Sequence, residues 1–403
     1  MNIFYMILSE RSLSIVHFEG SRGREAGTLG SMAEAHTAPA SPGALPRATD
    51  WVLRPFDMTS LSPVWVGLAY SLAYLGIYLA YHNLTGLMRG FEVIDVAPVF
   101  RDASGFEPRP LWQTPGWWSV LTNAALVGFV PTMGTYLRQG ARRDLIDLRP
   151  VLRVPASSFD ALVAEVVSTP KRYLRIAGAL GLLWGPMIPL LDRGVFGEIG
   201  TASLGEPLFY WIILQHMLFA WLITRLGVAE AHMTRAYARI GETSTDIDLL
   251  DLGPLAAFSR KGLRSALLWV ILTSIFSLFW LSPGAGRGNA LFVVLIVLLV
   301  TAAFLLPVRG VHHQIRATKR DELERVNRAI RDEREQVVPS RAPDRPIDAR
   351  LSNLVAYREL VERVREWPFD TSTLLRFALY VTLGIGSWLG GAIVEKLLES
   401  AMG

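Results

Sequence analysis

The sequence predicts an all-α polytopic membrane protein, a bundle of about seven transmembrane helices with a cytoplasmic helical hairpin. Three observations predict it. The 403 residues are 51% hydrophobic, with a mean hydropathy of +0.31. Seven windows are long and apolar enough to cross lipid, where an open backbone has no polar partner. Lys and Arg gather in alternate loops, which indicates membrane orientation and, with a net charge of only +4, argues against a nucleic-acid partner.

The absence of cysteine limits the chemistry. Disulfides, iron–sulfur clusters, thiolate zinc sites and cysteine nucleophiles are excluded. No phosphate-binding loop, nucleophile elbow or zinc-protease motif occurs, so the sequence predicts no cofactor, no metal and no catalytic residue.

Residues 1–63 are predicted to be a disordered cytoplasmic tail, because Gly, Ser, Ala and Pro dominate runs such as 38–46. The apolar run 3–8 is too short for a secretion signal. Met32 is an alternative translation start, and the hypothesis that residues 1–31 are not native can be tested by N-terminal mass spectrometry.

Six of the seven windows fall within residues 64–308, and the last falls within 371–403. The third contains Gly185, Pro186 and Pro189 and is expected to kink. The windows run from Val64 to Leu84, Gly116 to Tyr136, Leu174 to Leu191, Pro207 to Val228, Leu263 to Leu281, Ala290 to Val308, and Leu374 to Leu397.

The segments after the second, fourth and sixth windows are basic, whereas those after the third and fifth offer only Arg193 and Arg287. By the positive-inside rule, this alternation places the N-terminus in the cytoplasm and the C-terminus outside. Tryptophans lie near predicted membrane boundaries, which favours interfacial anchoring. They are Trp65, Trp112, Trp117, Trp118, Trp211, Trp280 and Trp367.

Residues 309–370 are predicted to form the cytoplasmic hairpin. Two charged helices flank the Pro-containing turn 339–346 and should fold back as an antiparallel, coiled-coil-like pair. Its apolar stripe is thin, so we expect a protein partner at residues 312–367, or a second copy of the chain. The seam residues are Leu323, Val326, Ile330, Leu354 and Val361.

A weak repeat links two loops: the segment 144–150, DLIDLRP, resembles 248–254, DLLDLGP. Each copy follows an even-numbered window. After the first copy, apolar residues at helical spacing over 159–167 predict a short amphipathic helix. A structural elbow is the favoured interpretation, with duplication of a helix pair as the alternative.

Polar residues inside the windows are candidates for a polar core or a transport path. His216 and Gln215 lie on the fourth helix, and Asn123 on the second helix is their candidate partner. No acidic residue lies at comparable depth, so interhelical hydrogen bonding is favoured over proton transfer. His312, His313, Glu230 and His232 lie at helix ends and are interpreted as solvated.

The last window is rich in glycine. Gly386 and Gly390 have the small-xxx-small spacing that lets another helix approach closely, so they are predicted to form a packing face within the bundle or between subunits.

Two stretches carry a resemblance to a known group. They are Lys319–Ile330, KRDELERVNRAI, and the run from Arg365–Asp370, REWPFD, through to 388–395, WLGGAIVE. Both resemble bacterial polytopic inner-membrane proteins that have no assigned activity and carry a Trp-Pro-Phe-Asp step before a glycine-rich last helix. The resemblance implies a bacterial inner membrane and transfers no catalytic residue.

The favoured function is an interaction or signal-relay protein that acts through its hairpin. A channel or transporter is the alternative, with the kinked third helix and His216 near its path. A membrane-embedded enzyme is third, because the pairs Asp144/Asp147 and Asp248/Asp251 are its only candidates and helix capping explains them more simply.

Overall fold

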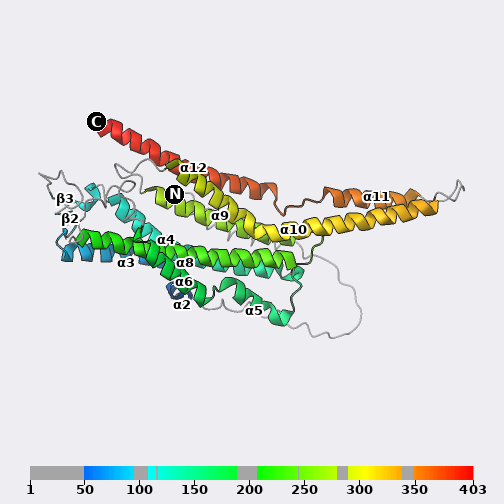
Figure 1. The fold of residues 1–403 in the computed structure, drawn as a ribbon, viewed down its shortest axis with the longest axis horizontal. Coiled ribbons are helices and arrows are strands. Elements are labelled where there is room, and N and C mark those ends of the chain that lie inside the picture. Colours follow the sequence, from blue (N-terminus) through cyan, green and yellow to red (C-terminus); the bar gives the residue numbers. More distant parts are fainter. Residues whose placement is uncertain are drawn as a thin grey trace, which may run out of the picture. The chain divides into compact units, whose positions relative to one another are not determined.

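The computed structural model is built almost entirely of helices (Figure 1). It describes residues 50–94, 108–114, 117–187, 207–243, 245–278, 289–337 and 348–402. Within this part the all-α class is confirmed. The helices are α2 (Arg54–Met58), α3 (Pro63–Leu84), α4 (Trp117–Leu148), α5 (Ala156–Val167), α6 (Lys171–Trp184), α8 (Pro207–Thr243), α9 (Ala256–Phe276), α10 (Asn289–Val337), α11 (Asp348–Arg363) and α12 (Thr371–Met402).

Short elements connect these helices. They are the strands β1 (Met88–Arg89), β2 (Glu92–Val93) and β3 (Arg109–Pro110), and the 3-10 turns η1 (Trp51–Leu53), η2 (Leu111–Gln113), η3 (Arg149–Val151) and η4 (Gly253–Leu255). The three strands form a small antiparallel sheet in the order β1-β2-β3, with Val93 opposite both Met88 and Arg109.

Four described helices, α3, α4, α8 and α10, are long and apolar enough to cross a membrane. They contain the first, second, fourth and sixth predicted windows. Helices α6, α9 and α12 overlap the other three predicted windows. However, α6 has only 14 residues, and α9 carries Arg260, Lys261 and Arg264 near its start. Since residues 188–191 and the side chains at the end of α12 lie outside the described part, the count of seven stays a prediction.

Helix α4 is the central helix of the bundle. Of the most apolar window of α4, 72% is buried inside the protein, whereas only 17% of the corresponding window of α3 is buried. It packs against α3, α8 and α9, and Leu126, Leu137 and Leu145 are fully buried along it. Where α3 crosses α4, a Cβ on Gly67 would lie 2.9 Å from the carbonyl oxygen of Gly128. Only glycine permits so close a backbone contact.

The chain before α3 is folded onto the bundle, unlike the predicted tail. From Asp50 onward the residues form η1 and α2, and Val52 and Phe56 are buried. The prediction of disorder through residue 63 is therefore wrong for residues 50–63. The runs rich in Pro and Gly end before residue 50, and the apolar side chains of Val52 and Phe56 beyond them are buried against the bundle.

Helices α5 and α6 lie against α8. The predicted amphipathic helix forms as α5, and Phe159, Val163, Val166 and Val167 on its apolar face are buried in the protein core. Helix α6 runs antiparallel to α8, because Leu174 contacts Arg225 while Gly181 contacts the earlier Ala220.

The two copies of the sequence repeat have different structures. Asp144 and Asp147 lie in the last turns of α4, whereas Asp248 and Asp251 lie in a loop and accept hydrogen bonds from the backbone N–H groups of Leu250 and Gly253. Helix-entry capping is therefore wrong for the first pair. The loops also meet, since the N–H of Asp246 donates to the carbonyl of Val151 at 2.7 Å.

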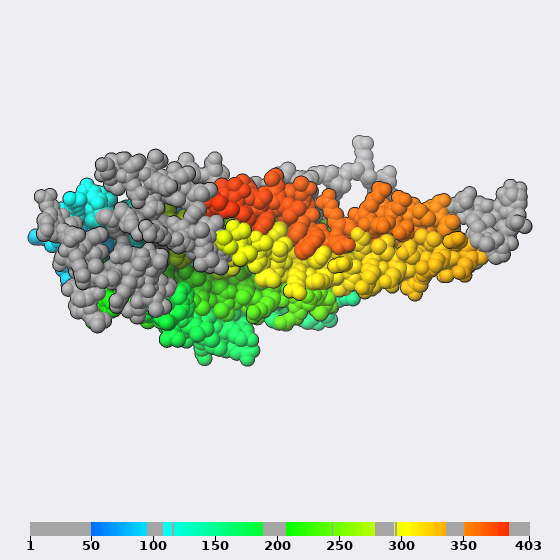
Figure 2. All heavy atoms as spheres, turned by 45° about the horizontal axis from the view of Figure 1, so that its top comes forward, coloured from blue at the N-terminus to red at the C-terminus, as the bar shows by residue number. Residues whose placement is uncertain are grey.

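Helix α10 continues well beyond its apolar window and packs with α11. Tyr357 donates to Glu322 at 3.2 Å, and Lys319 donates to the carbonyl of Val364 at 2.9 Å, so the two helices run antiparallel. Figure 2 shows the atoms of α11 in contact along the C-terminal part of α10. We call residues 312–337 of α10 together with α11 the two-helix arm.

Among the described tryptophans, Trp211 departs from the predicted interfacial belt, and Trp280 lies outside the described residues. Trp65, Trp112 and Trp118 are exposed, as anchoring residues should be. Trp211 is only 4% exposed and packs between the rings of Tyr78 and His82. The anchoring interpretation of Trp211 is therefore wrong, because α3 covers this face of α8.

Candidate functional site: buried charges inside the helix bundle

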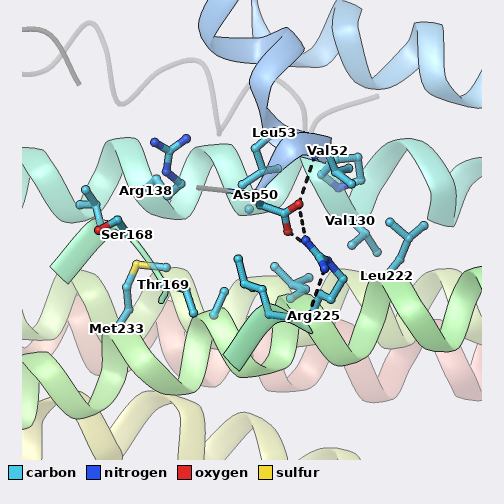
Figure 3. Close-up of a pocket in the computed structure, with 16 residues that line it drawn as sticks. Asp50, Val52, Leu53, Val130, Arg138, Ser168, Thr169, Leu222, Arg225 and Met233 are labelled. Atoms are coloured by element: carbon cyan, nitrogen blue, oxygen red, sulfur yellow. Dashed lines mark hydrogen bonds and ion pairs between the residues drawn. The ribbon is translucent and has the colours of Figure 1, made fainter. Parts of the chain in front are cut away.

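A small cavity lies where η1, α4, α6 and α8 meet (Figure 3). Its volume is about 50 Å³, which is room for a few water molecules. Val130, Leu222 and Leu226 form much of its apolar wall, and its charged lining residues are Asp50, Arg138 and Arg225. The cavity is too small for an organic substrate.

Arg225 is held by three polar contacts. Its Nη2 and Nε donate to the two carboxylate oxygens of Asp50 at 2.6 and 3.2 Å, and its Nη1 donates to the carbonyl of Leu174 at 3.1 Å. The guanidinium carbon lies 4.6 Å from the centre of the Trp221 ring. This fork geometry suits a carboxylate and ties α8 to both α6 and η1.

A second ion pair of an arginine and an aspartate lies on the neighbouring helix α4. Arg138 of α4 is buried and lies 3.3 Å from a carboxylate oxygen of Asp57 in α2. The segment before α3 thus brings two aspartates onto two arginines of membrane-length helices. Each pairing offsets the cost of burying a lone charge.

Glu230 and Lys261 form the most deeply buried ion pair of the described residues. Lys261 is fully buried and its Nζ lies 2.5 Å from Oε1 of Glu230 and 2.6 Å from Oγ of Ser265. Ser265 and Thr234 donate to the same Oε1 at 2.5 and 3.2 Å. The pair joins α8 to α9. Oε2 of Glu230 is buried and has no hydrogen-bond partner in the described part of the chain.

A third charged group joins α4 to α9. Asp144 is 1% exposed, Nε of Arg260 donates to it at 3.0 Å, and Arg264 also pairs with it. Arg260 reaches Asp147 as well, at 2.5 Å. Nearby, the hydroxyl of Tyr237 donates to the carbonyl of Ala141 at 2.9 Å. Together these contacts make a polar seam through α4, α8 and α9.

The chemistry of this seam is that of interhelical clamps. Each buried cation named above faces a carboxylate, and no group of three His, Asp or Glu side chains within the described ranges is arranged to hold a metal ion. The arrangement can lock helices to one another.

The structure brings two of the predicted polar-core residues together. Nδ2 of Asn123 lies 3.5 Å from Oε1 of Gln215, and the hydroxyl of Tyr74 lies 3.4 Å from the same oxygen. These are long contacts, but they join α3, α4 and α8 as interhelical hydrogen bonding requires. His216 instead pairs with the carbonyl of Ile212 in its own helix, at 2.8 Å.

The sequence analysis did not predict the buried ion pairs. Glu230 was interpreted as a solvated helix end, yet it is 4% exposed, so that interpretation is wrong. The window boundaries caused the error, because α8 continues in the protein core beyond its most apolar stretch. The available signal was Arg225 inside the fourth window, because a cation at that depth requires an acidic partner.

The predicted hairpin residues lie on the facing sides of the arm. Val326 and Val361 are buried, and Leu323, Ile330 and Leu354 are partly buried. At the base of the arm His312 stacks on Trp367 with ring centres 3.8 Å apart.

The glycine pair predicted for packing has no observed partner helix. A Cβ on Gly386 would meet nothing within 4 Å, and the surroundings of Gly390 lie outside the described residues. The pair therefore stays a prediction.

Comparison with known proteins gives no relative. The chain matches no protein-family model, no curated protein and no solved structure.

Proposed function

We propose that this chain is a seven-span inner-membrane protein of a bacterium, with its N-terminus and its two-helix arm in the cytoplasm and its C-terminus outside. The alternation of basic loops supports this topology. So does the outer surface of α6, where Ile176, Leu180 and Leu183 are more than half exposed, as expected of side chains that face lipid.

We propose further that the protein relays signals or recruits a protein partner through this arm. One observation carries the proposal: α10 is a single helix of 49 residues that combines a membrane-length apolar window with one side of the arm. A continuous helix transmits a shift or rotation in the bundle to the arm as a rigid element.

Contacts at both ends of this helix support a mechanical link. Within the bundle, Gly310 of α10 packs against the backbone of Ala238 in α8. At the arm's base His312 pairs with the carbonyl of Glu366 at 2.9 Å and stacks on Trp367. A movement of α8 would therefore reach α11 through packed groups.

The arm also presents exposed apolar side chains. On α11, Val355 is 41% exposed and Leu360 57%. A binding partner that covers Leu360 or Val355 would recover part of the hydrophobic free energy that their exposure forgoes.

Crosslinking of native membranes followed by mass spectrometry tests this function. The intact chain is compared with a variant that lacks residues 312–367 and with the double variant Val355→Asp/Leu360→Asp, which alters only exposed positions. A matched control, Met58→Asp/Leu61→Asp, places two new charges at exposed apolar positions of the segment before α3, outside the arm.

We expect one stoichiometric protein partner that is lost in both arm variants and retained in the control. If the same proteins crosslink to all four chains, the arm does not recruit them. If no protein crosslinks to the intact chain, the recruitment proposal fails, and transport becomes the leading function.

Transport is the second candidate, and the buried charges of the seam favour it. Ions that move through bundles commonly use intramembrane acids and bases of the kind found at Glu230 and Lys261. It ranks second because the described cavity holds only a few waters. Ion flux into liposomes, compared among the parent, His216→Ala and Glu230→Gln, tests it. Ion flux at the background level in all three proteins would rule out transport.

A further inference from the structure

A groove of about 830 Å³ lies between α5, α6 and α8, and its lining includes none of the ion-paired residues of the polar seam. Its walls are the first turns of α6 and the second half of α8, and the end of α5 closes one end. Its lining is graded, basic at one end and apolar at the other.

Helix α6 supplies one graded wall. Arg172, Ile176 and Leu180 follow one another at i, i+4 spacing, so they lie on one face of the helix. The arginine is therefore about 12 Å from the leucine along the axis. Ile176 and Leu180 are 57% and 52% exposed. The wall changes from a cation to open apolar surface within this length.

Helix α8 supplies a second wall with the same gradient. Val228, His232, Arg235 and Arg239 also share one helical face and line the groove. Helices α6 and α8 are antiparallel, and Leu174 lies beside Arg225 while Gly181 lies beside Ala220. The basic turns of α8 therefore continue past the start of α6, and Leu180 lies beside the apolar part of α8.

The basic end carries more positive charge than its surroundings balance. Glu165 is the acid in the lining, and it lies 3.6 Å from Arg239. Arg172 contacts the ring and hydroxyl of Tyr173, and no acidic partner is described for Arg172 or Arg235. His232 lies 3.1 Å from the carbonyl oxygen of Glu165. Two guanidinium groups are thus available for an anion.

The position along the helices identifies the source of that anion. The groove spans the point where the apolar windows of α6 and α8 begin and end, at Leu174 and Val228. This is the level at which phospholipid phosphates lie beside a membrane protein. A free phosphate would use the arginines alone and leave the apolar walls uncovered.

We propose that this groove binds an anionic phospholipid. Its phosphate lies between Arg172 and Arg235, with the hydroxyls of Ser168 and Tyr173 nearby, and one acyl chain runs along Ile176 and Leu180. Basic pockets between helices at a membrane boundary have the charge and shape for such headgroups. The proposal is independent of the arm and of transport.

Native mass spectrometry of the detergent-purified full chain tests the site. Retention of phosphatidylglycerol is compared with that of phosphatidylcholine in the parent and in Arg172→Gln/Arg235→Gln. The matched control Arg316→Gln/Arg328→Gln removes the same charge from exposed positions of α10. The variant Ile176→Asn alters the apolar wall alone. Thermal unfolding of each variant confirms that it is folded.

We expect the parent to retain phosphatidylglycerol in preference to phosphatidylcholine, and the groove double variant to lose this preference by about tenfold or more. The control should match the parent, and Ile176→Asn should weaken retention. Equal retention of both lipids by the parent would overturn the proposal, as would equal losses in the groove and control variants. Displacement of the lipid by a few millimolar inorganic phosphate would show a free-anion site instead.

Discussion

Single residues in this bundle carry charge where the surroundings are apolar, and geometry explains how each is tolerated. Lys261 has no exposed surface, yet its ammonium group meets a carboxylate and a hydroxyl. Breaking such a pair leaves one uncompensated charge, whereas replacing both members by apolar groups is often neutral. Buried pairs therefore make the structure sensitive to single substitutions and tolerant of matched ones.

Lys261→Met should lower the free energy of unfolding by about 3–5 kcal/mol, because the carboxyl group of Glu230 would stay buried without the cation that it faces. Adding Glu230→Leu should restore most of the loss. Thermal unfolding in detergent measures both. Arg153→Met is the control, since its pair with Asp246 is more than half exposed and should contribute little. A double variant as unstable as Lys261→Met would contradict the coupling.

Asp370 gives a pH-dependent prediction at the start of α12. Hydrogen bonds from Thr373 and Ser372 lower the pKa of its carboxyl group to about 2, from an ordinary 3.8. The folded state therefore favours the carboxylate. Its stabilisation is fully present above pH 3.8 and is lost as the pH falls through 2.

Asp370→Ala should therefore lower the stability by about 1 kcal/mol at pH 7, as the loss of a helix cap does. The difference from the parent should shrink between pH 4 and the folded pKa of about 2. Unfolding of both proteins at a series of pH values measures this. A difference that stays constant down to the lowest pH would show that the charge of Asp370 is not the cause.

Whole helices meet through glycine contacts and buried polar pairs. The backbones of α3 and α4 approach at Gly67 and Gly128, and those of α8 and α10 at Gly241 and Gly310. Small residues at such crossings allow dispersion contacts over a long interface, which lipid alone does not drive. The crossings set which helices are neighbours.

Gly128→Leu should separate α3 from α4 and lower the unfolding temperature by several degrees, since a side chain there would overlap the backbone of Gly67. Gly76→Leu is the matched control on α3, because a Cβ at Gly76 meets nothing within 4 Å. Thermal unfolding of the two variants compares them. Equal shifts would show that the α3–α4 contact does not limit stability.

At this scale, periodicity and composition predicted much of the fold. The apolar windows located α3, α4, α8 and α10, and the stripe that includes Val326 and Val361 located the contact of the arm helices. Periodicity failed for residues 50–63, because a short segment folds there by pairing Asp50 and Asp57 with arginines far along the chain. Local pattern carries no signal for such long-range pairs.

The candidate site was less predictable for the same reason. Hydropathy predicts where a helix enters lipid, but not which charged residue beyond that point is covered by a neighbouring helix. Glu230 and Lys261 are ordinary charged residues in sequence and become a buried pair only when α8 and α9 pack. Gln215 and Asn123 were found because both lie inside apolar windows.

For the molecule as a whole, the proposed topology makes a direct prediction. The sequence has no cysteine, so a single introduced cysteine is the only thiol in the chain that can react with a labelling reagent. Gln113→Cys precedes the second window and should react with a membrane-impermeant maleimide in intact spheroplasts. Ser352→Cys lies on α11 and should react only after the membrane is opened. Both positions are exposed. The reverse pattern would invert the topology.

The pairing of Asp50 with Arg225 also bears on how the chain is assembled during synthesis. The aspartate is made 175 residues before the arginine, so a neutralising partner already exists when α8 leaves the ribosome. Glu230, by contrast, must await Lys261, which follows 31 residues later. The order of synthesis therefore gives the arginine a partner that already exists, whereas the glutamate is made before its own.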